Sequence, residues 1–276
     1  MVESFDGLKL FTTRSLTDGM VGIVVLVHGL AEHSGRYSEL EVKLNEEQFG
    51  VYKFDHRGHG KSEGEKCYYS DFNDLIEDIN QIVERAKKSH TELPVYLIGH
   101  SMGGFGVASF GTKYPNKVDG IIISGGLTRD NSGMTSSIPA ELDDHFQLPN
   151  ELTEGVCSVE AVRIDYANDP LNSKTFSAGL IREIGQGVTW LKENTERFID
   201  SVLILHGAED TLVSYKDSLE FFKEIPAQDK QVKLYGNFFH EIFNEYGKDE
   251  VMSDVVNWIK FRIKENSKRN NPVKRC

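Results

Sequence analysis

The fold is decided by the stretch Val95-Tyr96-Leu97-Ile98-Gly99-His100-Ser101-Met102-Gly103-Gly104, in which an apolar run leads into the pattern G-x-S-x-G. The apolar run predicts a buried strand, and the residues from there to Lys113 are compatible with a helix. When a strand turns directly into a helix, the corner residue adopts strained backbone and its neighbours must lack bulk. We therefore expect Ser101 at the corner, with its hydroxyl above the strand end and the free N–H groups of the helix facing it.

Short apolar runs of the same kind recur along the chain and predict further strands. They occupy residues 23–27, 51–54, 121–123, 202–205 and 232–235. Most are apolar on both faces, which is typical of parallel strands covered on both sides. Helical patterns lie between and after them, at 71–86, 214–224 and 249–265. This alternation predicts an α/β fold with a mostly parallel central sheet flanked by helices and joined by right-handed crossovers.

One connection is too long for a simple crossover. Residues 127–201 separate two predicted strands, whereas a crossover needs only about a dozen residues. The stretch has helical patterns of its own at 172–184 and 187–198. We expect an inserted helical cap (a lid) at 127–201 on a core formed by 1–126 and 202–276, and no second independent domain.

The composition is that of a globular, acidic protein. Of its 276 residues, 39% are hydrophobic and 27% are charged. The 31 basic and 43 acidic residues give a net charge of −12, so nucleic acid is not an expected partner.

The cysteines and the apolar runs bear on the cell compartment. Cys67, Cys157 and Cys276 are odd in number and widely spaced, which suits neither a disulfide framework nor a zinc site. Residues 1–16 lack the pattern of a secretory signal, and the run 22–27 is too short to span a bilayer. We expect a cytoplasmic protein, and the oligomeric state stays open.

A serine hydroxyl is a weak nucleophile that needs a base, and the base needs an acid to orient it. In this strand–turn–helix context the chain order is serine, acid, histidine. Asp210 lies just past a predicted strand, and His240 is the only histidine after it. We expect Ser101, Asp210 and His240 to be the catalytic residues. Glu209 and Asp217 compete for the role of the acid.

The charge that develops on the substrate oxygen needs two backbone N–H donors. Met102, directly after Ser101, supplies one, and the loop after strand 23–27 supplies the other. Leu30 is the expected second donor, with Gly29 allowing close approach of the backbone. A Rossmann phosphate loop is disfavoured because its pattern requires glycine where Ser101 stands.

Five motifs together resemble the monoacylglycerol lipase / lysophospholipase-like family of α/β-hydrolases. They are residues 28–37 (HGLAEHSGRY), 55–64 (DHRGHGKSEG), 99–104 (GHSMGG), 168–171 (NDPL) and 206–210 (HGAED). The resemblance extends from about residue 5 to residue 265. It implies the α/β-hydrolase fold and a cofactor-free serine hydrolase that converts monoacylglycerol to fatty acid and glycerol through an acyl-enzyme.

The resemblance also implies a polar pocket for the head group of the substrate. Its residues correspond to Glu32, Arg36, Tyr37, His100 and Tyr166. The chain departs from the family at 30–31, where Leu-Ala replaces the Ala-Gly or Leu-Gly of many relatives, and residues 128–160 show no similarity that can be placed. The acyl-chain preference therefore stays open.

The cap bears on the acyl chain of the substrate. Phe176, Leu180, Ile181 and Ile184 fall within one predicted helix. We expect most of them to pack the cap core and the rest to line an apolar tunnel. A small-molecule lipid ester is the expected substrate, with transient contact between the cap and a lipid surface.

His56 and His59 have a spacing found among metal ligands. No carboxylate cluster completes a site, and serine chemistry needs no metal, so we expect neither a metal nor a cofactor. Asp55 and Arg57 are expected to pair and to brace the loop beneath the site.

Other functions stay open. The same fold serves broader carboxylesterases, lysophospholipases, thioesterases, feruloyl-type esterases and proline-type peptidases. Haloalkane and epoxide hydrolases resemble this fold but carry Asp at the turn. A catalytically dead binding protein of this fold would typically lack a triad member, and this chain keeps all three.

Overall fold

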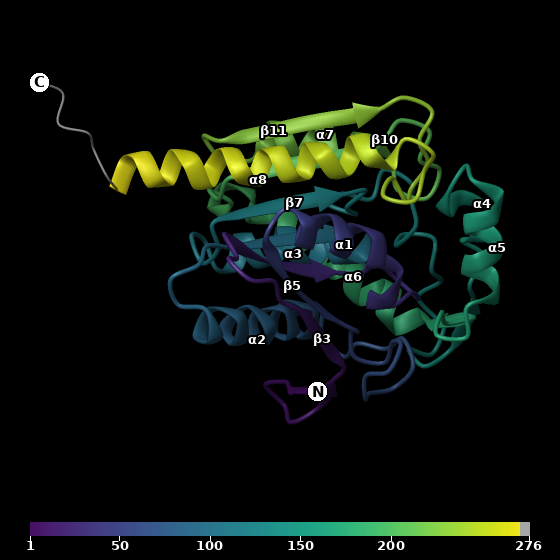
Figure 1. The fold of residues 1–276 in the computed structure, drawn as a ribbon. Helices are drawn as coiled ribbons and strands as arrows, with labels where there is room; N and C mark the ends of the chain where they lie inside the picture. Colours follow the sequence, from purple (N-terminus) through teal and green to yellow (C-terminus); the bar gives the residue numbers. More distant parts are fainter. Residues whose placement is uncertain (271–276) are drawn as a thin grey trace, which may run out of the picture.

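A seven-stranded sheet forms the centre of the computed structural model, which describes residues 1–270 (Figure 1). Its strands are β3 (Thr12–Ser15), β4 (Gly22–Val27), β5 (Phe49–Phe54), β6 (Val95–His100), β7 (Gly120–Ser124), β10 (Val202–Gly207) and β11 (Lys230–Tyr235). Their order is β11-β10-β7-β6-β4-β5-β3, and all neighbours are parallel except β3 and β5. The expected mostly parallel sheet is confirmed. A hairpin of β1 (Val2–Glu3) and β2 (Lys9–Leu10) precedes it.

Helices cover both faces of the sheet because alternate strand residues are buried on opposite sides. In β4, Ile23, Val25 and Val27 belong to one buried cluster, whereas Val24 and Leu26 belong to another. The first cluster includes residues of α2 (Asn73–Ser89), α3 (Met102–Lys113) and α7 (Tyr215–Glu224), and the second includes residues of α1 (Ser38–Glu46) and α8 (Lys248–Asn270).

Residues 127–201 connect β7 to β10 and contain both strands and helices. These are β8 (Gln147–Pro149), α4 (Thr153–Val156), α5 (Glu160–Asn168), β9 (Thr175–Ser177), α6 (Ala178–Glu193) and a short 3₁₀ turn, η2 (Thr195–Arg197). A second 3₁₀ turn, η1 (Ser34–Tyr37), lies outside the insertion, directly before α1. β8 and β9 pair as an antiparallel hairpin. In Figure 1, α4 and α5 lie at the right edge of the molecule, beyond the carboxyl ends of the strands.

The two helices predicted at 172–184 and 187–198 are wrong, because α6 is one continuous helix. It begins after Ser177, whose side chain accepts the N–H of Leu180 at 3.0 Å, as an N-cap does. Gly187 does not interrupt the helix. A Cβ at Gly187 would collide with Phe105, so this glycine serves close packing against α3.

The corner that positions the expected nucleophile lies between β6 and α3. Ser101 has φ 55° and ψ −119°, the strained backbone that the sequence predicts. A Cβ on Gly103, in the first turn of α3, would collide with the carbonyl oxygens of Val27 and His28. This absence of a side chain lets α3 begin directly against β4.

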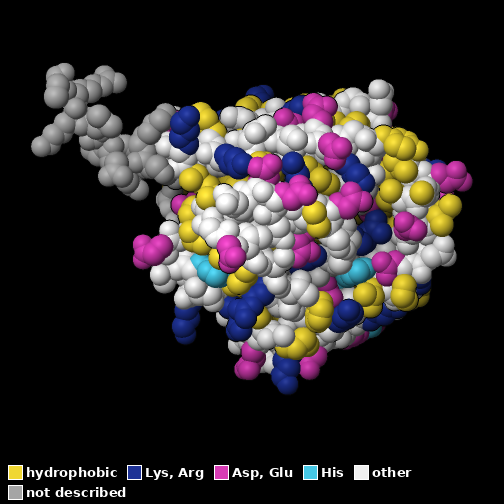
Figure 2. Space-filling view, in the orientation of Figure 1, with side chains coloured by type: hydrophobic (Ala, Val, Ile, Leu, Met, Phe, Trp, Pro, Cys, Tyr) yellow, Lys and Arg dark blue, Asp and Glu magenta, His cyan; other side chains and the backbone are white. Residues whose placement is uncertain are grey.

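The charges on the surface are mixed in sign. Figure 2 shows acidic and basic side chains interspersed over the visible face, and hydrophobic side chains gathered near the edge where Figure 1 places α4. Within the insertion, Phe146 and Ile164 are exposed.

We expect Gly103→Ala to lower the free energy of unfolding by about 1–3 kcal/mol, the usual effect of overpacking. The added methyl group meets backbone atoms of β4, which cannot rotate aside. Gly236→Ala is the matched control, because nothing lies within 4 Å of a Cβ there. Urea denaturation followed by circular dichroism measures both variants, and equal losses would contradict the packing argument.

Candidate active site

Four loops meet at one edge of the sheet because the strands that lead into them are parallel. They follow β4, β6, β10 and β11 and carry Leu30, Ser101, Asp210 and His240 respectively. A cavity of about 20 Å³ lies between them. Its lining is Gly29, Leu30, Glu32, His100, Ser101, Leu152, Val156, Tyr166, Leu212, His240 and Glu241. The structure thus brings the expected nucleophile and base to one cavity.

Asp210 is a buried carboxylate with both oxygens engaged. Oδ1 accepts the N–H groups of Leu212 and Val213, each at 2.9 Å. Oδ2 accepts Nδ1–H of His240 at 2.6 Å and Nε2–H of His206 at 3.0 Å. Burial alone would raise the pKa of Asp210, but the two histidines outweigh it and hold this pKa well below its usual range.

His240 has the tautomer that a general base requires. Because Nδ1–H donates to Asp210, Nε2 is left as the proton acceptor of the neutral ring. Burial disfavours the imidazolium form. The charge and hydrogen bond of Asp210, with smaller contributions from Glu241 and Glu32, nevertheless raise the pKa of His240 above its usual value.

The two competing acids lie elsewhere. Asp217 is buried in α7, where its oxygens accept the backbone N–H groups of Arg129 and Asn131 at 3.3 and 3.2 Å. Glu209 is exposed. Among the residues that the structure describes, neither carboxylate bonds to His240.

Two backbone N–H groups near Ser101 have no partner in the described part of the chain. They belong to Leu30, which borders the cavity, and to Met102, the first residue of α3. Ala31 follows Leu30 with φ 59° and is buried. This position is therefore left-handed backbone, which glycine favours. The departure from the family at 30–31 thus places alanine where many relatives have the glycine that this backbone suits.

The loop after β4 is braced from below by two histidines. His28 Nδ1–H donates to the Gly29 carbonyl oxygen at 2.8 Å. The backbone N–H of His56 donates to His28 Nε2 at 2.9 Å. The ring Nε2–H of His56 donates to the His28 carbonyl oxygen at 2.8 Å. His56 therefore stabilises the loop that carries Leu30.

The expected pairing of Asp55 with Arg57 is wrong, because the two side chains point to different elements. Asp55 Oδ1 accepts the N–H and the hydroxyl of Ser34 at 2.9 and 2.6 Å, in the loop after β4. Arg57 Nε and Nη2 both donate to Asp78 of α2 at 2.8 Å. Asp55 alone braces the loop beneath the site.

The five residues expected at the head group divide into two sets. Glu32, His100 and Tyr166 line the cavity, whereas Arg36 and Tyr37 do not. Arg36 and Tyr37 lie behind Glu32 and donate to its carboxylate, at 3.1 and 2.6 Å. Arg36 also packs its guanidinium over the ring of Tyr166, at 4.9 Å from the centroid.

Two cavity residues keep a polar atom available. Nδ1–H of His100 donates to the Ser124 carbonyl oxygen at 3.2 Å, and burial together with His240 holds the pKa of His100 well below its usual value. The ring is therefore neutral, with Nε2 as an acceptor. The hydroxyl oxygen of Tyr166 accepts Nδ2–H of Asn150 at 2.9 Å, and its O–H can still donate.

Three functional positions were missed by the sequence reasoning. His206, the second donor to Asp210, stands in the quoted motif 206–210, and Glu241 directly follows His240, so adjacency could have indicated both. Glu245 bonds to Ser158 across 87 residues of chain, and no sequence pattern indicates that contact.

The apolar wall of the cavity comes from Leu152, Val156 and Leu212. Phe176, Leu180, Ile181 and Ile184 all pack into the first buried cluster instead, as we expected for most of them. None of the four lines the cavity.

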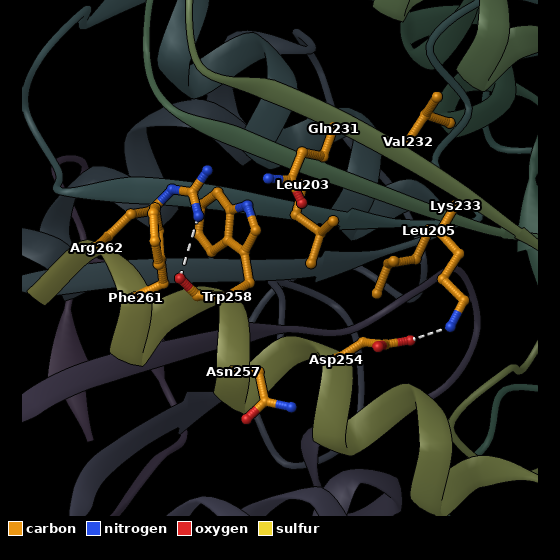
Figure 3. Close-up of a pocket in the computed structure, with 10 residues that line it drawn as sticks. All are labelled: Leu203, Leu205, Gln231, Val232, Lys233, Asp254, Asn257, Trp258, Phe261 and Arg262. Carbon is orange, nitrogen blue, oxygen red and sulfur yellow. Dashed lines mark hydrogen bonds and ion pairs between the residues drawn. The ribbon is translucent and has the colours of Figure 1, made fainter. Parts of the chain in front are cut away.

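A second hollow lies between β10, β11 and α8 and has a volume of about 330 Å³ (Figure 3). Its charged side chains are already paired. Lys233 Nζ donates to Asp254 at 2.6 Å, and Arg262 Nη1 donates to the Trp258 carbonyl oxygen at 3.1 Å. The hollow contains no serine, cysteine or histidine side chain and lies away from the carboxyl edge, so we assign it no chemistry.

In residues 1–270, no group of three or more His, Cys, Asp or Glu side chains could hold a metal ion. No helix in that range is both long and apolar enough to cross a membrane.

Comparisons with known proteins agree with the geometry. The chain matches the Hydrolase_4 family, described as serine aminopeptidase, S33, over residues 19–247. It is 31% identical over 246 residues to a monoacylglycerol lipase of Mycolicibacterium smegmatis, a match that covers 86% of this chain and 88% of that protein. It is 30% identical over 273 residues to the monoglyceride lipase of Rattus norvegicus, covering 94% and 89% of the two chains.

Solved structures give the same result. A soluble variant of the monoglyceride lipase from Saccharomyces cerevisiae, in complex with a substrate analog, matches with a TM-score of 0.83 and 26% identity over 95% of this chain and 94% of that one. The monoacylglycerol lipase of Paleococcus ferrophilus matches with a TM-score of 0.80 and 28% identity over 92% and 99%. The resemblance that the five motifs indicated and the α/β-hydrolase fold are both confirmed.

The raised pKa of His240 predicts that kcat/KM falls as the pH drops through a value above about 6.5, the usual pKa of histidine. The sign follows because the protonated ring cannot accept the serine proton. Asp210→Asn removes the charge that raises this pKa. We therefore expect the acid limb to move to lower pH and turnover to fall by about 10⁴-fold.

A pH series of kcat/KM with an aryl ester measures both effects. Glu209→Gln is the control, since Glu209 is exposed and adjacent to Asp210. An acid limb that stays in place in Asp210→Asn, or a larger loss in Glu209→Gln, would show that the acid is misassigned.

Proposed function

We propose the following function for this chain, which belongs to the Hydrolase_4 family, described as serine aminopeptidase, S33. The protein is a serine ester hydrolase, and we propose that its substrate is monoacylglycerol, which it cleaves to fatty acid and glycerol. We assign the nucleophile to Ser101, the base to His240 and the orienting acid to Asp210. One observation carries the proposal: a single cavity contains Ser101 and His240, with His240 bonded to the buried Asp210.

The proposed reaction begins when Ser101 Oγ attacks the ester carbonyl carbon while His240 Nε2 takes the hydroxyl proton. The oxyanion accepts hydrogen bonds from the N–H groups of Leu30 and Met102, which have no other partner in the described residues. His240 then returns the proton to the departing glycerol oxygen, which leaves an acyl-enzyme. Water activated by His240 attacks the acyl-enzyme and releases the fatty acid.

Asp210 supports each proton transfer without taking the proton itself. Its carboxylate is fixed by two backbone N–H groups and a second histidine, so it does not rotate away from His240. The imidazolium that forms twice in the cycle lies against a permanent negative charge.

We expect Ser101→Ala to abolish ester hydrolysis and labelling by a fluorophosphonate probe, because the side chain that forms the acyl-enzyme is gone. Circular dichroism and the thermal midpoint should match those of the unmodified chain. Ser137→Ala is the control, since its hydroxyl is exposed and bonds only to the Met134 carbonyl oxygen. Labelling of Ser101→Ala at another serine would contradict the assignment.

The choice of monoacylglycerol is supported by the polar groups around the reacting centre. His100 offers an acceptor and Tyr166 a donor, and both line the cavity with Ser101. A glycerol head group has hydroxyls that can bond to both. A buried group that is built to bond a hydroxyl rejects an analogue without one far more strongly than apolar fit does. We therefore propose a preference for monoacylglycerol over di- and triacylglycerol.

Tyr166→Phe tests this preference. We expect it to lower kcat/KM for monoacylglycerol by about 10-fold or more, in keeping with one lost hydrogen bond, and to change the aryl ester of the same acyl chain less. Tyr37→Phe is the matched control, because Tyr37 donates to Glu32 behind the cavity and should affect both substrates alike. Equal losses on both substrates in Tyr166→Phe would favour a broader carboxylesterase.

A peptidase is the second candidate, because the description of the matched family names an aminopeptidase. The carboxylates of Glu32 and Glu241 line the cavity and would attract a free amino terminus. A panel of monoacylglycerols, lysophospholipids, thioesters and aminoacyl nitroanilides separates these activities.

We also propose that residues 127–201 act as the cap over this site. The exposed side chains of Phe146 and Ile164, in the insertion, support transient contact with a lipid surface. The free thiols of Cys67 and Cys157, both buried, support a reducing, cytoplasmic location.

A further inference from the structure

The part of the insertion that we call the cap arm, residues 152–168, contacts the loop that carries Asp210. Leu212 of that loop packs in a small apolar cluster with Val156, Cys157 and Tyr166 of the arm. A Cβ on Gly155 would approach Leu212 to 2.6 Å, so the arm lies directly on the loop.

The cap arm is also hydrogen-bonded to both sides of His240. The N–H of Glu241 donates to the Val156 carbonyl oxygen at 2.7 Å. The N–H of Phe239, on the other side, donates to Glu245 Oε1 at 2.9 Å. That same oxygen accepts the N–H of Ser158 at 2.9 Å. The peptide group that follows His240 is therefore tied to the arm directly, and the N–H of the preceding residue, Phe239, is tied to it through Glu245.

Glu245 is well suited to hold this position. Its side chain is buried, with 2% of the residue exposed. Besides the two N–H groups, it accepts the hydroxyl of Ser158. The Cys157 thiol, also in the arm, hydrogen-bonds to it as well, and no Lys or Arg in the described residues pairs with it.

We propose that Glu245 is a positioning residue for His240, and that it holds the base in place only while the cap arm is seated. The inference rests on the proposed function, since it assumes that His240 is the base. The two Ser158 donors and the N–H of Phe239 meet at one carboxylate, so displacement of the arm removes the donors that hold this carboxylate beside Phe239 and thereby weakens the support of the base.

The small size of the cavity is the reason to expect such displacement. A space of about 20 Å³ holds about one water molecule, which is far smaller than a glycerol group with its ester. Leu152 and Val156 of the arm form part of the wall beside Ser101. We therefore expect the arm to move outward when substrate enters, and its return to restore the support of His240.

The test measures turnover per active site, so that loss of folded protein is not counted as loss of catalysis. Active sites are titrated with a fluorophosphonate probe, and kcat and KM are measured with an aryl ester. We expect Glu245→Ala to lower kcat by about 10- to 100-fold, the effect of a misplaced catalytic group, with little change in KM. Glu245→Gln should stay within about threefold of the unmodified chain, because an amide keeps an acceptor for both N–H groups.

Ser158→Ala tests the arm side of the same link. It removes only a hydroxyl, so the fold is not at risk. We expect kcat to fall here too, but by less than in Glu245→Ala. The double variant with Glu245→Ala should be no slower than Glu245→Ala alone, because both changes break one network. Glu250→Gln is the matched control, since Glu250 pairs with Lys233 on the surface.

Two results would overturn the inference. One is a kcat per titrated site in Glu245→Ala that stays within about twofold of the unmodified chain. The other is strict additivity of Ser158→Ala and Glu245→Ala, which would separate the arm from the base. Failure of the unmodified chain to react with the probe would overturn the proposed function itself and this inference with it, and is seen before any variant is compared.

Discussion

Backbone N–H groups in loops at a buried sheet edge need acceptors, and in the described residues buried carboxylates supply several of them around this site, although not those of Leu30 and Met102. Glu32 and Asp55 hold the loop after β4, Asp210 holds its own loop, and Glu245 holds the loop of His240. Each carboxylate accepts at least one backbone N–H. Loss of one carboxylate leaves a buried donor unsatisfied, at about 1–3 kcal/mol, so the precision of the site depends on these anions.

This arrangement limits what several residues can offer to a substrate. Glu32 accepts from Gly29, Arg36 and Tyr37, so most of its hydrogen-bonding capacity stabilises the loop after β4. Arg36 is shared between Glu32 and Glu241 and offers no free charge to a substrate. Charge at the head-group end is therefore largely satisfied within the protein. This favours a neutral polyol over an anionic group as the part of the substrate that lies there.

The parts of the fold that follow from local pattern were predictable from the sequence. The strained corner at Ser101 follows from its glycine neighbours, and the strands follow from apolar runs buried on both faces. In a strand–turn–helix setting of this kind the expected chain order is serine, acid, histidine, so the positions of Ser101, Asp210 and His240 could be predicted together. α6 was predicted as two helices because a glycine such as Gly187 looks like a break when its packing partner is unknown.

Contacts between distant segments could not be predicted in this way. A carboxylate in a loop has many potential donors, and only the folded chain shows which one it meets. Asp55 therefore suggested an ion pair with a neighbour in sequence, whereas it bonds to Ser34 on another loop. Glu245 gave no signal, because its donors come from its own loop and from the insertion.

The same contacts limit how readily the site opens. Outward movement of the cap arm breaks the bond from Glu241 to Val156 and the two bonds from Ser158 to Glu245. At about 0.5–1.5 kcal/mol each, their loss puts the open state a few kcal/mol above the closed one, and separation of the arm from Leu212 adds to this difference. Each methylene of an acyl chain that becomes buried returns about 0.8 kcal/mol. A chain of several methylenes therefore offsets the broken bonds, whereas a very short ester does not, so the arm makes occupancy of the site depend on acyl length before any contact with the head group is made.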